Sequence, residues 1–181
     1  GGGTTQLGEG LLTTLGQYKT YDGPWALKEN LQHLSVWSKY SQPTNYGMLK
    51  ASVSGYHATW NPTEQIPERV IGTLVCPDEF CVLDATAKGQ TTRWIANAQL
   101  LAEDWRATAY GQYYDWRMSS NPTYDDQIDQ FDRRWIVGGR YENKILKTDR
   151  VELRAGTEIR YDEIGNVGVD HDVAGVELVD T

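Results

Sequence analysis

Residues 151–162 read Val-Glu-Leu-Arg-Ala-Gly-Thr-Glu-Ile-Arg-Tyr-Asp, and this stretch decides the fold. Its odd positions are uncharged, from Val151 to Tyr161, whereas its even positions are mostly charged, from Glu152 to Asp162. A helix, with about 3.6 residues per turn, would mix these two sets, but a strand places them on opposite faces. The stretch therefore predicts a β-strand with one apolar and one charged face.

The same alternation recurs along the chain and predicts an all-β fold of about eight strands. It is clear in residues 32–40, 46–57, 92–102, 105–114 and 131–141. It is weaker in residues 11–21, and residues 172–181 resemble a strand that is cut short. Short connections are predicted near residues 42–45, 103–104 and 143–149. Longer connections are predicted at residues 22–30, 60–91, 117–129 and 163–171.

The composition excludes several classes of protein. The chain has 181 residues, of which 39% are hydrophobic, so it is too apolar for general disorder. No run approaches the roughly 18 apolar residues of a membrane helix. A formal charge of -8 argues against nucleic acid as a partner. The chain has 11 Tyr and 7 Trp but only 2 Phe. Because Tyr and Trp combine an apolar ring with a polar group, this composition favours surfaces that are partly exposed to water, such as binding sites and membrane interfaces.

Two architectures fit the alternating strands. Turns that are alternately short and long are typical of an antiparallel up-and-down transmembrane β-barrel, and the apolar faces end in Trp or Tyr, as interfacial girdles do. A soluble β-sandwich also has alternating strands. Polar faces that carry Arg, Glu, Lys, Asn and Gln suit a wet barrel lumen or a solvated outer surface equally well.

From about residue 20 onward, the chain resembles the barrel of TonB-dependent receptors, the gated outer-membrane importers of Gram-negative bacteria. The resemblance depends on the order and spacing of several short motifs over some 150 residues. These are Asp22-Gly23-Pro24-Trp25, Trp60-Asn61-Pro62-Thr63-Glu64-Gln65-Ile66-Pro67, Asp84-Ala85-Thr86, Gly89 with Thr91-Thr92-Arg93, Ala109-Tyr110 with Tyr113-Tyr114-Asp115, Gln130-Phe131-Asp132-Arg133-Arg134 with Gly138-Gly139, and Gly156-Thr157-Glu158-Ile159-Arg160-Tyr161-Asp162 with Val167-Gly168.

The resemblance implies a 22-stranded barrel in the cell outer membrane, filled by an N-terminal plug. About eight strands cannot supply so wide a lumen. Nothing in the chain resembles a plug or a TonB-contacting box, and both ends look like cuts. We therefore expect residues 1–181 to be an internal segment of such a barrel domain.

Function follows from the same resemblance. The parent would import a scarce chelate, such as a ferric siderophore, or another large nutrient. Its partners would be outer-membrane lipid, the ligand, and an inner-membrane TonB complex that acts through the plug. No enzyme activity, catalytic residue or cofactor is expected. The alternatives are a small free-standing outer-membrane barrel with a structural or adhesive role, and a soluble β-sandwich that binds carbohydrate through its aromatic residues.

Aromatic residues at the ends of strands are the candidate ligand-binding residues. They are His57, Trp60, Tyr114 and Trp116. For His57, an ordinary strand-end histidine is the simpler interpretation. Three scattered histidines form neither a catalytic triad nor a metal site, and the hydrolase and phosphate-loop motifs are absent from the sequence.

Two further groups of residues concern loops. Cys76 and Cys81 lie inside the long connection over residues 60–91; if it is extracellular, an oxidising compartment favours a disulfide over free thiols or a metal site. Asp170-His171-Asp172 is expected in a loop, where it would bind a cation or simply be solvated.

Charged residues recur on the polar side of the predicted strands. They are Arg93, Arg106, Arg134, Arg140, Arg154 and Arg160 with Asp132, Glu142, Glu152 and Glu158. In a lumen we expect them to form cross-strand pairs of opposite charge, each contributing roughly 0.2–1 kcal/mol. They would solvate the interior and hold a plug, or line a path for a polar or anionic chelate.

Overall fold

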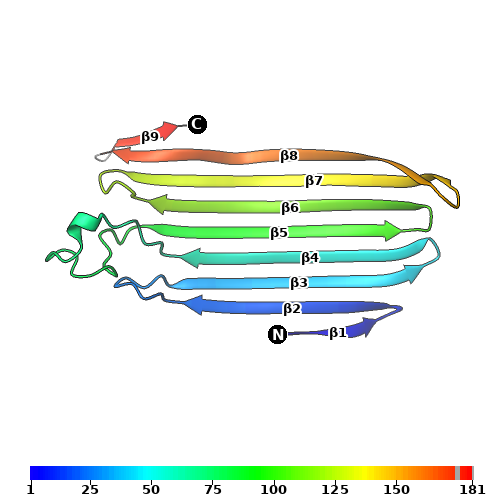
Figure 1. The fold of residues 1–181 in the computed structure, drawn as a ribbon, viewed down its shortest axis with the longest axis horizontal. Coiled ribbons are helices and arrows are strands. Elements are labelled where there is room, and N and C mark those ends of the chain that lie inside the picture. Colours follow the sequence, from blue (N-terminus) through cyan, green and yellow to red (C-terminus); the bar gives the residue numbers. More distant parts are fainter. Residues whose placement is uncertain (174–175, 181) are drawn as a thin grey trace.

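The computed structural model describes residues 1–173 and 176–180 and shows a chain built of β-strands (Figure 1). The strands are β1 (Gly2–Leu7), β2 (Gly10–Tyr21), β3 (Leu31–Thr44), β4 (Gly47–Trp60), β5 (Lys88–Leu101), β6 (Trp105–Ser120), β7 (Gln127–Lys147), β8 (Glu152–Val173) and β9 (Val176–Asp180). One short 3₁₀ helix, η1 (Glu68–Val70), lies between β4 and β5. The predicted all-β fold is confirmed, with β1 as a strand that the sequence pattern did not predict.

The nine strands form one antiparallel sheet in which every strand pairs with the next one in sequence. The predicted up-and-down arrangement is therefore confirmed. Within residues 1–173 and 176–180, the pairing runs in a line from β1 to β9, and no ladder joins the two outer strands. The sheet thus has two open edges. None of the described residues belongs to a helix with the length and apolar character needed to cross a bilayer.

The connections alternate in length, as predicted, and the two kinds lie at opposite ends of the sheet (Figure 1). The short turns comprise residues 8–9, 45–46, 102–104 and 148–151. The longer connections comprise residues 22–30, 61–87 and 121–126. All three longer connections gather at one end, which we call the loop end; the other is the turn end.

In the segments that alternate clearly, the cross-strand register places the apolar positions of every strand on the same face of the sheet. Val53 lies opposite Ser38 and Ala96, and Ala96 lies opposite Gly111. Gly111 in turn lies opposite Val137, and Val137 lies opposite Tyr161. Because directly paired residues point to the same side, this row belongs to one face. We call it the apolar face, and the opposite side the polar face.

The apolar face is not covered by other parts of the described chain. Among the described residues, the buried hydrophobic side chains are those of Ala58, Cys76, Cys81 and Ala87, which do not form a core for a sheet of this size. Large apolar-face side chains are exposed instead, including Trp135 at 54% and Ile159 at 73%. Such a continuous apolar surface on a soluble protein marks a site that something else covers.

The expected loop over residues 163–171 is wrong, because β8 continues through it to Val173. The pairing of β7 with β8 shifts from Arg134–Ile164 to Arg133–Asn166, which leaves Gly165 as the extra residue of a bulge. A bulge resets the period-two alternation, so the strand reads as irregular in sequence. Asp170 and His171 therefore lie in a strand rather than at a loop tip. The expected loop over 117–129 likewise shrinks to residues 121–126.

The segment that resembles a strand over residues 172–181 is only partly described. Its first residues end β8, and β9 pairs back onto β8 from Val169 to Val173. Residues 174–175 and 181 lie outside the described residues. The hairpin is consistent with the up-and-down order of the rest of the sheet.

Candidate functional site

The three longer connections are bonded to one another at the loop end. The backbone N–H of Ala26 donates to the carbonyl oxygen of Phe80 at 2.8 Å, and the rings of Trp25 and Phe80 lie 6.0 Å apart. The backbone N–H of Asn61 donates to the carbonyl of Glu29 at 2.7 Å. Connection 22–30 therefore packs against connection 61–87 on one side.

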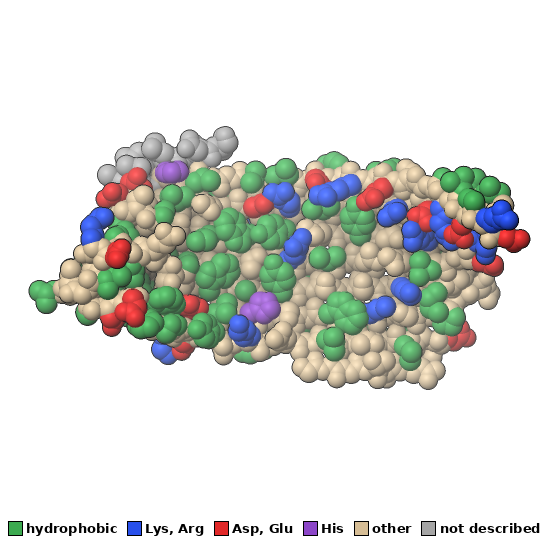
Figure 2. Space-filling model, in the orientation of Figure 1, with side chains coloured by type: hydrophobic (Ala, Val, Ile, Leu, Met, Phe, Trp, Pro, Cys, Tyr) green, Lys and Arg blue, Asp and Glu red, His purple; other side chains and the backbone are tan. Residues whose placement is uncertain are grey.

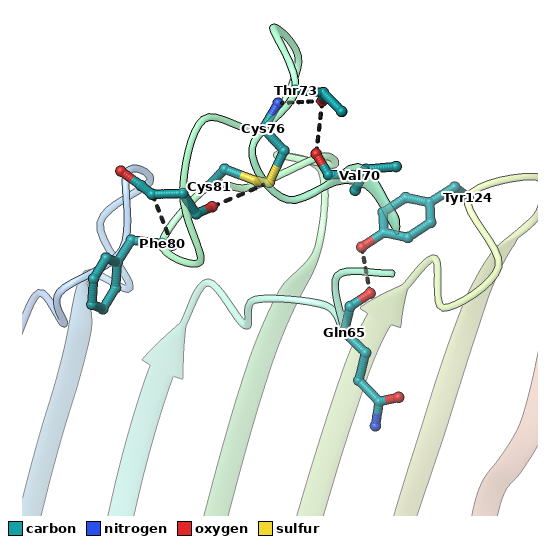
Figure 3. Close-up of a disulfide and its surroundings, with 8 residues drawn as sticks. Gln65, Val70, Thr73, Cys76, Phe80, Cys81 and Tyr124 are labelled. Carbon is teal, nitrogen blue, oxygen red and sulfur yellow. Dashed lines mark hydrogen bonds between the residues drawn. A yellow bond between two sulfur atoms is a disulfide. The ribbon is translucent and has the colours of Figure 1, made fainter. Parts of the chain in front are cut away.

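Connection 61–87 is also closed upon itself around its two cysteines (Figure 3). Cys76 and Cys81 form a disulfide with Cα atoms 5.4 Å apart. The Thr73 hydroxyl donates to the carbonyl of Val70 at 2.7 Å and accepts from the backbone N–H of Cys76 at 3.3 Å. The closed segment carries Phe80 toward Trp25 and exposes Leu74 completely.

A second set of contacts joins connection 61–87 to connection 121–126. Asn121 donates through its backbone N–H to Glu64 at 2.9 Å and through Nδ2 to Asp84 at 2.8 Å. The Tyr124 hydroxyl donates to the carbonyl of Gln65 at 2.7 Å, and burial raises the pKa of Tyr124 (Figure 3). The loop end is thus one bonded cluster rather than three separate loops.

Asp84 is the charged centre of this second set of contacts. The hydroxyl of Thr86 donates to Asp84 at 2.6 Å and its backbone N–H at 2.7 Å. These two bonds lower the pKa of Asp84 below its usual range, with a smaller contribution from Asn121 and against the opposing effect of burial. The ionised form is therefore the one that holds the loops together.

Replacing Asp84 with Ala is expected to loosen the Thr86 and Asn121 contacts. A lost hydrogen bond of this kind costs about 0.5–1.5 kcal/mol, so amide exchange around Thr86 should become roughly 2–10 times faster at pH 7. Because the folded-state pKa is lowered, the stabilisation is complete above the unfolded value of about 3.9 and is lost as the pH falls through the folded value. Hydrogen-exchange mass spectrometry, corrected for intrinsic rates, measures both effects. Asp125→Ala is the control. Equal exchange in the two variants would contradict the role of Asp84 in holding Thr86 and Asn121.

The structure places three of the four predicted ligand-binding residues on the same face of the sheet. Trp60, Tyr114 and Trp116 lie on the polar face near the loop end, where they are paired with Gly89, Arg93 and Thr91 respectively. His57 lies on the apolar face, where its Nδ1 is 2.8 Å from the Thr92 hydroxyl. Residues 57 and 60 are three apart, and residues an odd number apart in a strand point to opposite sides. His57 therefore does not join the other three.

The polar-face charges lie where the sequence placed them, but their pairing differs from the prediction. One cross-strand pair is strong: Arg106 donates to Glu142 at 2.6 Å. Three other arginines bind a carboxylate two residues away in their own strand: Arg160 binds Asp162, Arg134 binds Asp132, and Arg154 binds Glu152. Neighbours two apart share a face and lie within reach of a long side chain, so they compete with cross-strand partners.

Three arginines surround the carboxylate of Glu142 near the turn end. Besides Arg106, it has Arg140 at 3.4 Å and Arg154 at 3.7 Å. Its side chain is only 10% exposed. Arg154 also binds Glu152 at 2.5 Å, so the three guanidinium groups share two carboxylates in this part of the polar face.

Sequence reasoning missed a row of residues that spans four strands of the polar face. The register places Tyr56 opposite Arg93, Arg93 opposite Tyr114, and Tyr114 opposite Arg134. The guanidinium carbon of Arg93 lies 5.8 Å from the centre of the Tyr114 ring. Only the register between strands brings these residues together, so the local pattern gave no signal for them.

Comparisons with known proteins add no identification. No family model, no curated protein and no solved structure matches the chain. Among the residues that the structure describes, no group of three or more His, Cys, Asp or Glu side chains is placed to hold a metal ion. The two faces of the sheet and the bonded loop end are therefore the features that bear on function.

Proposed function

We propose that the chain is part of an outer-membrane β-barrel that transports a solute across the membrane through its polar interior. The observation that carries the proposal is the uncovered apolar face bounded by aromatic residues. On the loop side, Trp94, Tyr113 and Trp135 occupy one row, with the rings of Tyr113 and Trp135 4.7 Å apart. On the turn side, the rings of Trp105 and Tyr141 lie 6.2 Å apart.

The distance between the two aromatic rows supports a membrane. Trp105 and Tyr113 are eight residues apart in β6, which is about 27 Å along a strand and about 20 Å across a bilayer at a tilt near 40°. The lipid-facing band of outer-membrane barrels is about 25 Å tall. Between these rows β6 exposes only Ala107, Ala109 and Gly111 on this face.

Charged side chains lie at and beyond the aromatic row on the loop side, where Glu163 is the register partner of Trp135. On the loop side, Arg133 donates to Asp115 at 2.8 Å, one row beyond Tyr113 and Trp135. On the turn side, the apolar pair Leu146 and Leu153 follows the row of Trp105, and the ion pair between Lys144, on the polar face, and Asp104, in the turn, is 2.7 Å long. On the loop side, apolar, aromatic and charged zones in this order match hydrocarbon, interface and water.

Within this proposal, the resemblance to TonB-dependent receptors supplies the transport mechanism. The sheet would form part of a closed, 22-stranded barrel, and the loop end would face the outside. The substrate would be a scarce chelate, such as a ferric siderophore, or another large nutrient, and an inner-membrane TonB complex would act through a plug. The polar face rich in charged and aromatic side chains supports a wide, wet interior.

An accessibility scan along β6 tests the membrane face. Single nitroxide labels at residues 107–114 are placed on the protein expressed from its whole gene and reconstituted in lipid vesicles. We expect collisions with oxygen to be frequent at odd positions, and collisions with an aqueous nickel complex to be frequent at even ones. Even positions, such as Gln112, are the matched control because they share the strand.

Other outcomes distinguish the alternatives. Odd positions closed to both reagents indicate a face packed on a second sheet, and the β-sandwich then replaces the membrane barrel. If the scan succeeds but disruption of the gene leaves uptake of ferric chelates unchanged in iron-starved cells, the barrel has a structural or adhesive role. Loss of uptake of one chelate, reproduced when the proton gradient is collapsed, supports the importer.

A further inference from the structure

The polar face carries an excess of basic side chains in a chain whose formal charge is -8. Register and alternation place the basic residues Lys39, Lys50, Arg93, Arg106, Arg134, Arg140, Arg154 and Arg160 on this face, against the acidic residues Asp132, Glu142, Glu152, Glu158 and Asp162. In Figure 2, Lys and Arg side chains (blue) are spread over the middle of the face toward the viewer. A basic surface of this kind attracts anions.

Arg93 differs from most of these basic residues because it has no carboxylate partner. Among the described residues, its one hydrogen bond runs from Nη2 to the neutral Gln112 at 2.9 Å, and its Nε is buried without an acceptor. A guanidinium group has five N–H donors and pairs best with a carboxylate. By contrast, the neighbouring Arg134 is held by Asp132.

Aromatic side chains flank Arg93 in both directions. Tyr114 lies on one side at 5.8 Å from the guanidinium carbon, and Tyr56 is its register partner on the other side. The ring of His33 lies 5.8 Å from that of Tyr56 and extends the aromatic surface. A charged group with rings on both sides suits a ligand that has an anionic group attached to a flat ring.

Two hollows open beside this group and both are lined by Tyr56 and Arg93. One has a volume of 470 Å³ and extends toward Trp37 and Gln17. The other has a volume of 320 Å³ and extends toward Tyr114 and Arg134. Each lies within the range of about 300–1,000 Å³ that is usual for small-molecule sites.

We infer that Tyr56, Arg93 and Tyr114 form a subsite for an aromatic anion, with Arg93 binding the anionic group and the tyrosines packing on the ring. As a subsite for the transported solute it rests on the proposed function, because it assumes that the polar face lines the path. The contacts themselves require only that the sheet is folded.

Calorimetric titration with benzoate tests the subsite, using the protein expressed from its whole gene and purified in detergent. We expect benzoate to bind at least 10-fold more tightly than the neutral benzamide and than acetate, which lacks the ring. Arg93→Gln should weaken benzoate binding at least 10-fold, and Tyr56→Leu and Tyr114→Leu should each weaken it several-fold. Arg154→Gln is the control: it removes a basic residue of the same face and should change the affinity less than 2-fold.

Folding and function are separated by two further measurements. Heat-modifiable electrophoretic mobility confirms that each variant is folded, and Arg93→Lys, which keeps the charge, should lose less affinity than Arg93→Gln. Equal binding of benzoate and benzamide, or no effect of Arg93→Gln in folded protein, overturns the subsite while leaving the β6 scan and the transporter untouched. Benzoate binding that depends on Arg93 supports the subsite even if the β6 scan shows no lipid-facing side.

Discussion

Arginine in place of Ala98 is expected to remove most of the protein from the outer membrane of cells that express the gene. Ala98 pairs with Ala51 and Ala109, in the row midway between the two aromatic rows of the apolar face. A charge at the bilayer midplane costs about 2–4 kcal/mol, which is a large part of the stability of most proteins. The measurement is the amount of folded, protease-resistant protein in the outer-membrane fraction.

The position of each substitution along the strand should set the size of its effect. Val53 lies one row from Trp94 and Trp135, so Val53→Arg should cost somewhat less than Ala98→Arg. Leu153 lies beyond the row of Trp105 toward the turn end, where the cost falls to about 0–1 kcal/mol. The sequence pattern predicts that Arg impairs assembly at all three positions, and the structure predicts a graded series among them.

Polar-face positions provide matched controls for this series. Asn97 is the chain neighbour of Ala98 and points the other way, and Ser52 is its register partner. Asn97→Arg, Ser52→Arg and Gln112→Arg should assemble normally, because their side chains lie on the polar face, which lines the lumen in the proposed barrel. Equal sensitivity of the apolar and polar sets would show that the two faces do not separate lipid from lumen.

Local alternation was enough to predict the strands and their faces. Each of the segments 32–40, 46–57, 92–102, 105–114, 131–141 and 151–162 separates its own apolar set, and the register then aligns those sets on one side. Alternation failed where the backbone departs from a period of two, at the bulge around Gly165. It also failed for β1, whose sequence Gly-Gly-Thr-Thr-Gln-Leu has almost no apolar side chains to alternate.

The candidate site is formed by contacts between different strands and connections, which the sequence of a single strand does not reveal. Arg93 meets Tyr56 and Tyr114 only because β5 pairs with β4 and β6 in one particular register. A slip by one residue would send Arg93 to the apolar face. The contact between Phe80 and Trp25 likewise joins two connections far apart in sequence, so the bonded loop end was not predictable from motifs.

Residues 1–181 alone are expected to aggregate in detergent rather than to form a stable closed barrel. β9 pairs only with Val169–Val173 of β8, so most of β8 has one side without a partner strand among the described residues. On the opposite edge, β1 is only six residues long. In hydrocarbon each unpaired N–H or C=O costs several kcal/mol, so a long open edge is not tolerated there.

The test compares the refolded 181-residue chain with the whole gene product in the same micelles, each run on gels with and without boiling. We expect a mobility shift for the whole product and none for the chain.

The polar face explains why closure of these strands alone is unfavourable: a barrel of about eight strands has an interior just wide enough for side chains to fill. Here that interior would have to enclose Arg93, Arg134, Arg140, Tyr114 and Trp37 together, and Arg93 has no carboxylate partner among the described residues. A heat-modifiable, protease-resistant monomer of the chain alone would show that these side chains do fit, and a small free-standing barrel would then replace the segment of a wider transporter.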